Sequence, residues 1–267
     1  MTNDLWDGFP QSLVINDMPL TEQYAEIARL AGGLAHEIKN PLSTIRLNME
    51  LLAEDFEEID SPQGRRALKK VNVMQKECHR LEELLNDFLD FARAHRLELH
   101  PAELNSEIKD VLEFFRPKAA ESKIDIIEYF ASNLPTVSLD RRSFHRAMLN
   151  LVLNAQQAMP QGGQLVVRTR PVGSDVAIDL IDTGIGMDTE TLERLFETFY
   201  STKRSGSGLG LPTTRKIIDA HGGRMAVQSE PNCGTQFTIT LPSLLRIESE
   251  SNPGTAPRSV PGSFLCE

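Results

Sequence analysis

Hydrophobic and polar residues alternate in the first part of the chain with the spacing of two amphipathic helices. From about residue 21 to 56, apolar side chains recur at Leu30, Leu34, Ile38, Ile45, Met49 and Leu52. This spacing lines one face of an α-helix, and we expect that face to be buried. A polar stripe of residues seven positions apart (Arg29, His36, Ser43 and Glu50) lies on another face, so His36 is predicted to point outward.

A second helix is predicted from about residue 65 to 96, after a connection that contains Pro62 and Gly64. Its apolar positions alternate by three and four, as in a coiled-coil seam; they are Val71, Met74, Cys78, Leu81, Leu85, Phe88 and Ala92. A single pair of helices cannot bury faces this apolar. We therefore predict that two copies pair into a four-helix bundle and that the protein is a homodimer.

After residue 100 the pattern changes to short apolar or alternating runs, which are typical of strands. Strands are predicted at 124–129, 136–139, 165–170, 176–181, 224–228 and 236–241, and helices at about 106–121, 141–158 and 209–221. Strands and helices mix here without a regular βαβ alternation. We therefore predict an α+β fold in which helices cover one face of a sheet, an α/β sandwich.

These patterns divide the chain into a short N-terminal segment (1–20), a helical hairpin (21–97), the α/β sandwich (98–243) and a disordered tail rich in Ser, Pro and Gly (244–267). The first segment is too short for a sensory domain, which needs about 100 residues. No apolar run approaches the roughly 18 residues of a membrane span, and the first residues lack signal-peptide features. We expect a cytoplasmic protein without a membrane anchor.

The net charge and the cysteines limit the kinds of ligand and compartment that suit the protein. The net charge of −10 argues against non-specific binding of nucleic acid. It also means that an anionic ligand must meet positive groups placed locally. The spacing of the three cysteines indicates neither a disulfide framework nor a zinc site, which fits a reducing compartment.

The residues around His36 are suited to group transfer. A neutral imidazole offers a nucleophilic nitrogen, so an exposed histidine on a rigid helix can accept a phosphoryl group. Glu37 lies beside it and can orient or deprotonate the ring, and Asn40, one turn further on, can hold a water near the ring. Pro41 removes a backbone donor and is predicted to interrupt and bend the helix just past His36.

Four separated pieces of the second half suit a nucleotide. Asn150 and Asn154 lie one turn apart on an otherwise apolar helix, where a carbonyl oxygen can bind Mg²⁺ together with phosphate. Asp182 can accept a hydrogen bond from an exocyclic amine, and the glycines after it let backbone approach a flat base. Lys203 can reach phosphate, and the last piece precedes a helix whose amide groups favour anions. The remaining members of these pieces are Gly184, Gly186, Thr202, Gly206, Gly208, Leu209 and Gly210.

The run A-H-E-I-K-N-P-L at residues 35–42 resembles the phosphoacceptor box of sensor histidine kinases of two-component systems. The resemblance implies that His36 is phosphorylated, that Glu37 is the acid/base residue and that Asn40 positions water for a phosphatase reaction. His79, His95, His145 and His221 match no such box and are expected to be structural or solvated.

The order N, D-x-G-x-G, F, G-x-G-x-G resembles the ATP-binding domain shared by histidine kinases, type II topoisomerases, a heat-shock chaperone and mismatch-repair ATPases. It covers about residues 100 to 243. The resemblance implies that Asn154 binds Mg²⁺, with Asn150 nearby, that Asp182 binds adenine and that Gly206 to Gly210 bind phosphate. It also implies a mobile lid over residues 187–207 that closes on ATP.

Together the two resemblances indicate a histidine kinase, similar to the soluble nitrogen-regulation sensor kinases. They imply a dimeric helical-hairpin domain followed by an ATP-binding domain, with ATP and Mg²⁺ as ligands. The expected reaction is autophosphorylation on His36, then transfer to an aspartate of a separate response regulator, with phosphatase activity toward that regulator. Two alternatives remain: an ATP-driven clamp that hydrolyses ATP without labelling His36, and a non-catalytic scaffold that binds a regulator.

Overall fold

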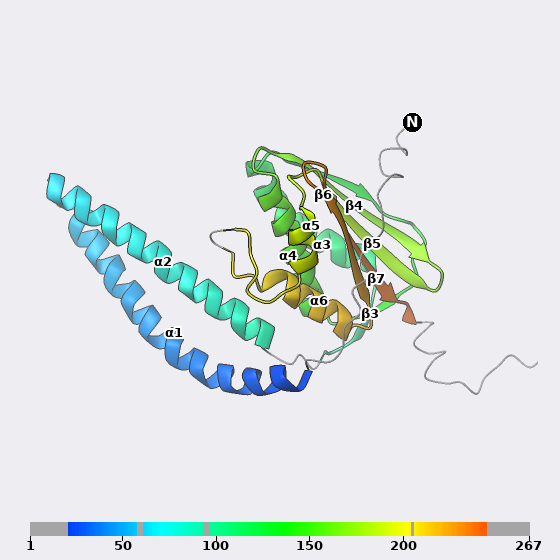
Figure 1. Cartoon of the computed structure of the whole chain (residues 1–267), viewed down its shortest axis with the longest axis horizontal. Coiled ribbons are helices and arrows are strands. Elements are labelled where there is room, and N and C mark those ends of the chain that lie inside the picture. Colours follow the sequence, from blue (N-terminus) through cyan, green and yellow to red (C-terminus); the bar gives the residue numbers. More distant parts are fainter. Residues whose placement is uncertain (1–20, 58–60, 93–96, 204–205, 245–267) are drawn as a thin grey trace, which may run out of the picture.

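The computed structural model describes residues 21–57, 61–92, 97–203 and 206–244, with side chains in the first helix from residue 38 onward. The segment 1–20, and all but the first residue of the segment 244–267, lie outside the described residues. Figure 1 shows a hairpin of two long helices, α1 (Thr21–Glu57) and α2 (Pro62–Ala92), beside a unit of sheet and shorter helices. Among the described residues, no helix combines the length and the hydropathy that crossing a bilayer requires.

The hairpin buries only part of its predicted apolar faces within one chain. Leu42 and Met49 of α1 pack against Val71 and Cys78 of α2, and all four are nearly inaccessible to solvent. In contrast, the expected stripe on α1 is 44% exposed at Ile38, and its members Ile45 and Leu52 are similarly exposed. Helix α1 is thus turned so that the 42/49 edge faces α2. Of the expected stripe, Met49 is buried within one chain, and the burial of Ile38, Ile45 and Leu52 by a second copy stays a prediction.

Two local expectations for the hairpin also change. Helix α2 begins at Pro62 rather than at residue 65, because Ser61 caps it: its hydroxyl accepts from the amide of Gly64 at 3.0 Å. Proline suits the first helical position, where no backbone donor is needed. Pro41 does not interrupt helix α1, which runs through it as the predicted span of residues 21–56 requires, and the helix curves along its length (Figure 1).

The second unit is built on a five-stranded sheet with the order β2-β4-β5-β7-β6. Strand β2 pairs parallel to β4, and the other pairs are antiparallel. Strands β1 and β3 form a second, two-stranded antiparallel sheet, and β3 lies beside the end of β7. The strands are β1 (His100–Ala102), β2 (Ile124–Tyr129), β3 (Val137–Leu139), β4 (Gly163–Val172), β5 (Asp175–Asp182), β6 (Arg224–Glu230) and β7 (Gly234–Pro242).

Helices cover one face of this sheet, which confirms the predicted fold class (Figure 1). They are α3 (Leu104–Glu121), α4 (Arg141–Ala158) and α6 (Gly210–Ala220), with the short α5 (Thr189–Arg194) following β5. Every strand and helix predicted after residue 100 is present. The short elements β1 and α5 were not predicted, because three to six residues carry too little periodicity to stand out.

One apolar core joins the helices to the sheet. Phe115 of α3 and Phe144 of α4 are almost fully buried, together with Leu165 of β4. His221, at the end of α6, is also buried: its Nδ1 lies 2.7 Å from the carbonyl oxygen of Ile217, and its Nε2 lies 3.0 Å from the amide of Asp140. That contact holds the N-terminus of α4 against α6, which is a structural role.

Neighbouring phenylalanines on α3 provide a test of this core. Replacing Phe115, which is 2% exposed, by alanine is expected to lower the free energy of unfolding by about 3–5 kcal/mol, because it leaves a cavity. Replacing Phe114, which is 74% exposed, by alanine should change it by less than about 0.5 kcal/mol. Equilibrium denaturation in urea measures both. Equal losses in the two variants would show that α3 does not pack as described.

Candidate functional site

One face of helix α4 is buried in the core, so the side-chain amides of Asn150 and Asn154 on its other face point to a cavity. Its N-terminus is fixed by Asp140, whose carboxylate accepts from the amide of Ser143 at 2.9 Å. Met148 and Leu151 are buried, whereas Asn150 and Asn154 are half-buried. The Asn150 side chain donates to the carbonyl oxygen of Gly210 at 3.3 Å, which ties α4 to the start of α6.

Asn154 is one of two side-chain carbonyls that meet a cation. The ammonium of Lys203 donates to Oδ1 of Asn154 at 3.1 Å and also to Oε1 of Gln157. Burial lowers the pKa of Lys203 below its usual value, and the charge of Asp182 opposes that change. Gln157 was missed in the sequence, although it lies three residues after Asn154 and so on the same helix face. The two oxygens form a site for a positive charge.

Asp182 ends β5 and is the buried acid of the cavity. It is 3% exposed, and one of its oxygens accepts from the amide of Gly184 at 2.9 Å. Burial raises the pKa of Asp182 to about 6, while the backbone donors of Gly184 and Thr235 and the charge of Lys203 act in the opposite direction. The carboxylate is therefore a strong acceptor at neutral pH with few competing waters.

The glycines around the cavity are required by close backbone contacts. Gly186 has φ of +65°, and a Cβ there would overlap the carbonyl oxygen of Glu230 at the turn between β6 and β7. Gly208 has φ of +67°, and a Cβ would lie 2.5 Å from the carbonyl carbon of Phe199. Packing within the protein thus explains both glycines, where the sequence indicated an approach to a ligand.

The glycine-rich segment, residues 206–210, leads into α6, and no side chain caps the first amides of that helix. Leu209 occupies the cap position, is 1% exposed and makes no side-chain cap bond to α6. The uncapped amides and the helix dipole favour an anion at this end. Thr202, Gly206 and Gly210 line the same cavity. Residues 204 and 205 lie outside the described residues.

One cavity of about 740 Å³ brings most of these groups together. Its lining includes Asn150, Asn154, Gln157, Asp182, Gly186, Thr202, Lys203, Gly206, Gly208 and Gly210. Gly184 and Leu209 lie next to lining residues. Helix α2 forms the opposite wall, where the hydroxyl of Ser207 donates to Asp87 at 2.7 Å. Nearby, Lys216 of α6 donates to the carbonyl oxygen of Phe91 at 2.9 Å. The hairpin and the cavity are thus in direct contact.

The predicted phosphoacceptor residues lie on α1. His36 and Glu37 fall within its helical span, but their side chains lie outside the described residues. Asn40 is exposed, and its backbone carbonyl oxygen accepts from the hydroxyl of Thr44 at 3.1 Å. Asn40 is therefore accessible to a partner protein and to water.

Two family models match the chain in the order of its two units. The His Kinase A (phospho-acceptor) domain matches residues 26–96, and the histidine kinase-, DNA gyrase B- and HSP90-like ATPase matches residues 139–245. The chain belongs to the sensor histidine kinases of two-component systems. Helix α1 thus carries the box of the phosphoacceptor domain, and most residues that line the cavity belong to the ATPase-like domain.

Curated relatives are longer histidine kinases. Sensor histidine kinase ZraS of Escherichia coli (strain K12) is 32% identical over 232 residues, which is 87% of this chain and 49% of ZraS. Sporulation kinase E of Bacillus subtilis (strain 168) is 33% identical over 227 residues, 85% of this chain and 30% of the relative. The chain spans about half or less of the length of these relatives.

Solved histidine kinases share the fold. Full-length ShkA in complex with AMPPNP has a TM-score of 0.67 and 27% identity, over 80% of this chain and 46% of ShkA. The catalytic domain of ThkA has a TM-score of 0.51 and 30% identity, over 55% of this chain and 97% of that domain. ThkA in complex with the response regulator TrrA has a TM-score of 0.60 and 23% identity, over 86% of this chain and 69% of ThkA.

The raised pKa of Asp182 predicts a pH-dependent nucleotide affinity for this histidine kinase. With a pKa of about 6 in the folded protein, the carboxylate is ionised at pH 7.5 and becomes protonated as the pH falls through 6. If it accepts from the adenine amino group, the affinity for ADP should drop about tenfold between pH 7.5 and pH 5. Isothermal titration calorimetry measures this change.

The control for this experiment is Asp182→Asn, which cannot titrate. It should bind ADP more weakly at pH 7.5 and keep only the pH dependence that comes from the phosphates of ADP. A variant with the same pH profile as the natural protein would show that Asp182 is not the titrating acceptor.

Proposed function

We propose that the chain catalyses ATP-dependent autophosphorylation of His36 and passes the phosphoryl group to an aspartate of a separate response regulator. The observation that carries this proposal is the shared cavity, in which Asn154, Asp182 and the glycine-rich segment face helix α2 of the hairpin. A hairpin that forms one wall of the nucleotide site keeps the phosphoacceptor helix within the same assembly. Transfer between the two units then needs only a change in their relative position.

Different residues of the cavity bind the base and the phosphates of the nucleotide. Asp182 accepts from the adenine amino group, while the walls formed by Ile185 and Met187 give the base an apolar surface. Thr202, Lys203 and the amides around Gly206 to Gly210 receive the phosphates, where positive charge and the dipole of α6 offset the repulsion from a chain of net charge −10. Asn150 holds the start of α6 in place through Gly210.

The residues at Asn154 fit a magnesium ion. Two side-chain carbonyl oxygens, of Asn154 and Gln157, already converge on the Lys203 ammonium, and oxygen donors are what Mg²⁺ prefers. Mg²⁺ bound there supplies charge neutralisation to the phosphates of ATP. With Asn154 and Gln157 holding the ion, the ammonium of Lys203 would turn toward a phosphate.

The chemistry at His36 needs a neutral ring. One ring nitrogen forms a bond to the γ-phosphorus as the bond from that phosphorus to the bridging oxygen breaks, and ADP leaves. Glu37 accepts the proton from the other ring nitrogen. Asn40, one turn away and exposed, holds the water that attacks the aspartyl phosphate of the regulator in the phosphatase reaction, which releases inorganic phosphate and restores the aspartate.

We also propose that the hairpin pairs with a second copy. Two rows of apolar residues spaced by seven remain exposed, on α1 at Ile38, Ile45 and Leu52 and on α2 at Met74 and Leu81. Their side chains are 43% to 50% exposed within one chain. Such rows are the seam of a four-helix bundle, in which the hairpin of the second copy covers them.

The remaining elements of the proposal follow from the two units. Residues 21–97 serve dimerisation and phosphotransfer, and residues 98–243 bind ATP. The partner is the receiver domain of a separate response regulator, a class of protein with which ThkA, of the same fold, forms a complex. We propose that these steps take place in the cytoplasm.

Labelling with ATP that carries a marked γ-phosphate tests the kinase. The natural protein is expected to gain an acid-labile, alkali-stable label, and His36→Gln should lose it while still binding ATP. His79→Gln is the matched control, because His79 is an exposed histidine of the same hairpin, and it should label normally. ATP hydrolysis without a label on His36 would instead indicate an ATP-driven clamp, and binding without hydrolysis a scaffold.

The phosphatase role rests on Asn40. Asn40→Ala is expected to slow dephosphorylation of the phosphorylated cognate regulator about a hundredfold, because the attacking water loses its position, and to leave autophosphorylation intact. Asn48→Ala, eight positions further along α1, is the control, since Asn48 is exposed and its side-chain amide donates to the backbone carbonyl oxygen of Thr44 within α1. Unchanged dephosphorylation in Asn40→Ala would rule out this role.

A further inference from the structure

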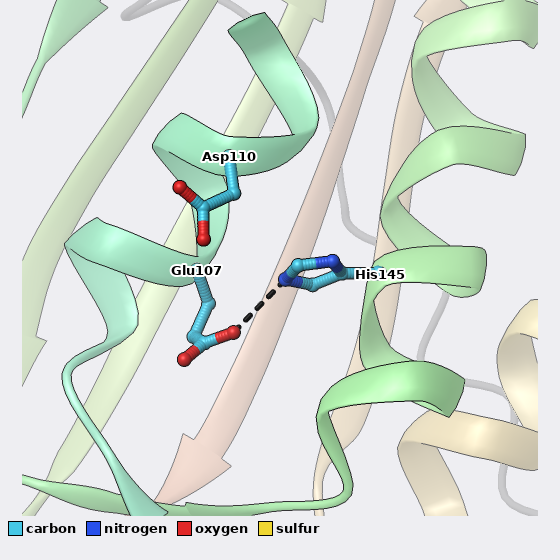
Figure 2. A group of neighbouring side chains, drawn as sticks. All are labelled: Glu107, Asp110 and His145. Atoms are coloured by element: carbon cyan, nitrogen blue, oxygen red, sulfur yellow. Dashed lines mark hydrogen bonds and ion pairs between the residues drawn. The ribbon is translucent and has the colours of Figure 1, made fainter. Parts of the chain in front are cut away.

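A second group of chemically active side chains lies away from the ATP cavity. Glu107 and Asp110 lie one turn apart on α3, and His145 faces them from α4 (Figure 2). One ligand atom from each residue lies within 4.8 Å of the other two. None of the three lines the nucleotide cavity. We infer that these residues form a binding site for one transition-metal ion of the Zn²⁺ type.

The position of Glu107 is the first reason. Its side chain is only 5% exposed, and carboxylates are rarely kept in such positions unless a cation or a metal compensates for the lost water. One of its oxygens lies 3.0 Å from Nε of Arg141, and the other lies 2.9 Å from Nε2 of His145. Arg141 is 65% exposed and keeps the outer oxygen, so the inner oxygen is the one that faces the proposed ion.

The second reason is the combination of charges. Asp110 places another carboxylate beside that of Glu107, and two like charges this close favour a cation between them. Arg141 already compensates one negative charge from the outside. An ion between the inner oxygen of Glu107, the carboxylate of Asp110 and the ring of His145 balances the remainder.

The donor set selects the kind of ion. One imidazole nitrogen with two carboxylate oxygens suits Zn²⁺, which binds both at about 2.0–2.2 Å, whereas Mg²⁺ prefers oxygen donors alone. Ligands at these distances lie a little over 3 Å apart around a tetrahedral ion. The three ligand atoms here lie within 4.8 Å of one another, so small rotations of the side chains bring them to that separation. A cavity of about 400 Å³, lined by Glu107, Asp110 and Arg141, opens beside the group and leaves room for water as the fourth ligand.

Such an ion joins α3 to the first turns of α4. The natural chain, freed of metal by a chelator, is expected to bind one Zn²⁺ in calorimetry and to unfold at a higher temperature with Zn²⁺ than without it. Mg²⁺ should produce no such shift in the absence of nucleotide. These measurements use no ATP, so they are independent of the proposed kinase activity.

Two variants locate the ion without disturbing the core. His145→Gln and Asp110→Asn replace half-buried or exposed groups, and each should weaken Zn²⁺ binding by at least about tenfold and remove the thermal shift. His79→Gln is the matched control, because His79 also lies beside a glutamate, Glu83, at 3.4 Å but has no third ligand in the described structure; it should bind Zn²⁺ normally.

Zn²⁺ could instead bind to cysteines elsewhere in the chain, and the absorption spectrum of bound Co²⁺ distinguishes the two kinds of site. Co²⁺ on nitrogen and oxygen ligands lacks the near-ultraviolet charge-transfer band that thiolate ligation gives. The inference is overturned if the natural chain binds no Zn²⁺, if Co²⁺ shows thiolate ligation, or if His145→Gln and Asp110→Asn bind Zn²⁺ as the natural chain does.

Discussion

The apolar face of α4 can pack only against the covered face of the sheet, and much of the nucleotide site depends on that constraint. Phe144, Met148 and Leu151 are all almost fully buried there. Once they are in place, the helix cannot rotate, so Asn150 and Asn154 have to face the cavity. The cap at Asp140 and its contact with His221 then fix how far along its axis α4 sits relative to α6.

The cavity keeps an acid where burial is unfavourable. A pKa of about 6 in place of the usual 3.8 means that ionised Asp182 costs the fold about 3 kcal/mol at neutral pH. An apolar residue at the end of β5 would avoid that cost. Retaining the carboxylate gives a ligand an acceptor that water has not already satisfied, and the ammonium of Lys203 offsets part of the charge.

The regular part of this architecture could be predicted from the sequence. Long amphipathic helices and alternating strands have periodicities that specify them locally, and the box around His36 and the pieces at Asn154 and Asp182 are contiguous motifs. Gln157 was within reach of the same reasoning, since it follows Asn154 by three positions. The exposure of Ile45 within one chain could not be predicted in this way, because the rotation of α1 about its axis depends on which edge packs against α2.

Contacts between distant segments were also beyond the sequence. Asp87 and Ser207 are 120 positions apart, and neither has neighbours that mark it as a contact. The group of Glu107, Asp110 and His145 likewise assembles only when α3 and α4 pack side by side. The reason is the same in both cases: periodicity describes one element at a time and does not identify the element that will lie opposite.

The hydrogen bond between Ser207 and Asp87 couples the position of the hairpin to the arrangement of the glycine-rich segment, and this coupling acts in both directions. A ligand that draws Ser207 away from Asp87 weakens the hold on α2, and a force on α2 changes the affinity for that ligand by the same free energy. Because the contact is polar and joins elements that each have their own core, breaking it leaves both folds intact. Information about the state of either unit can thus reach the other through this exchangeable hydrogen bond.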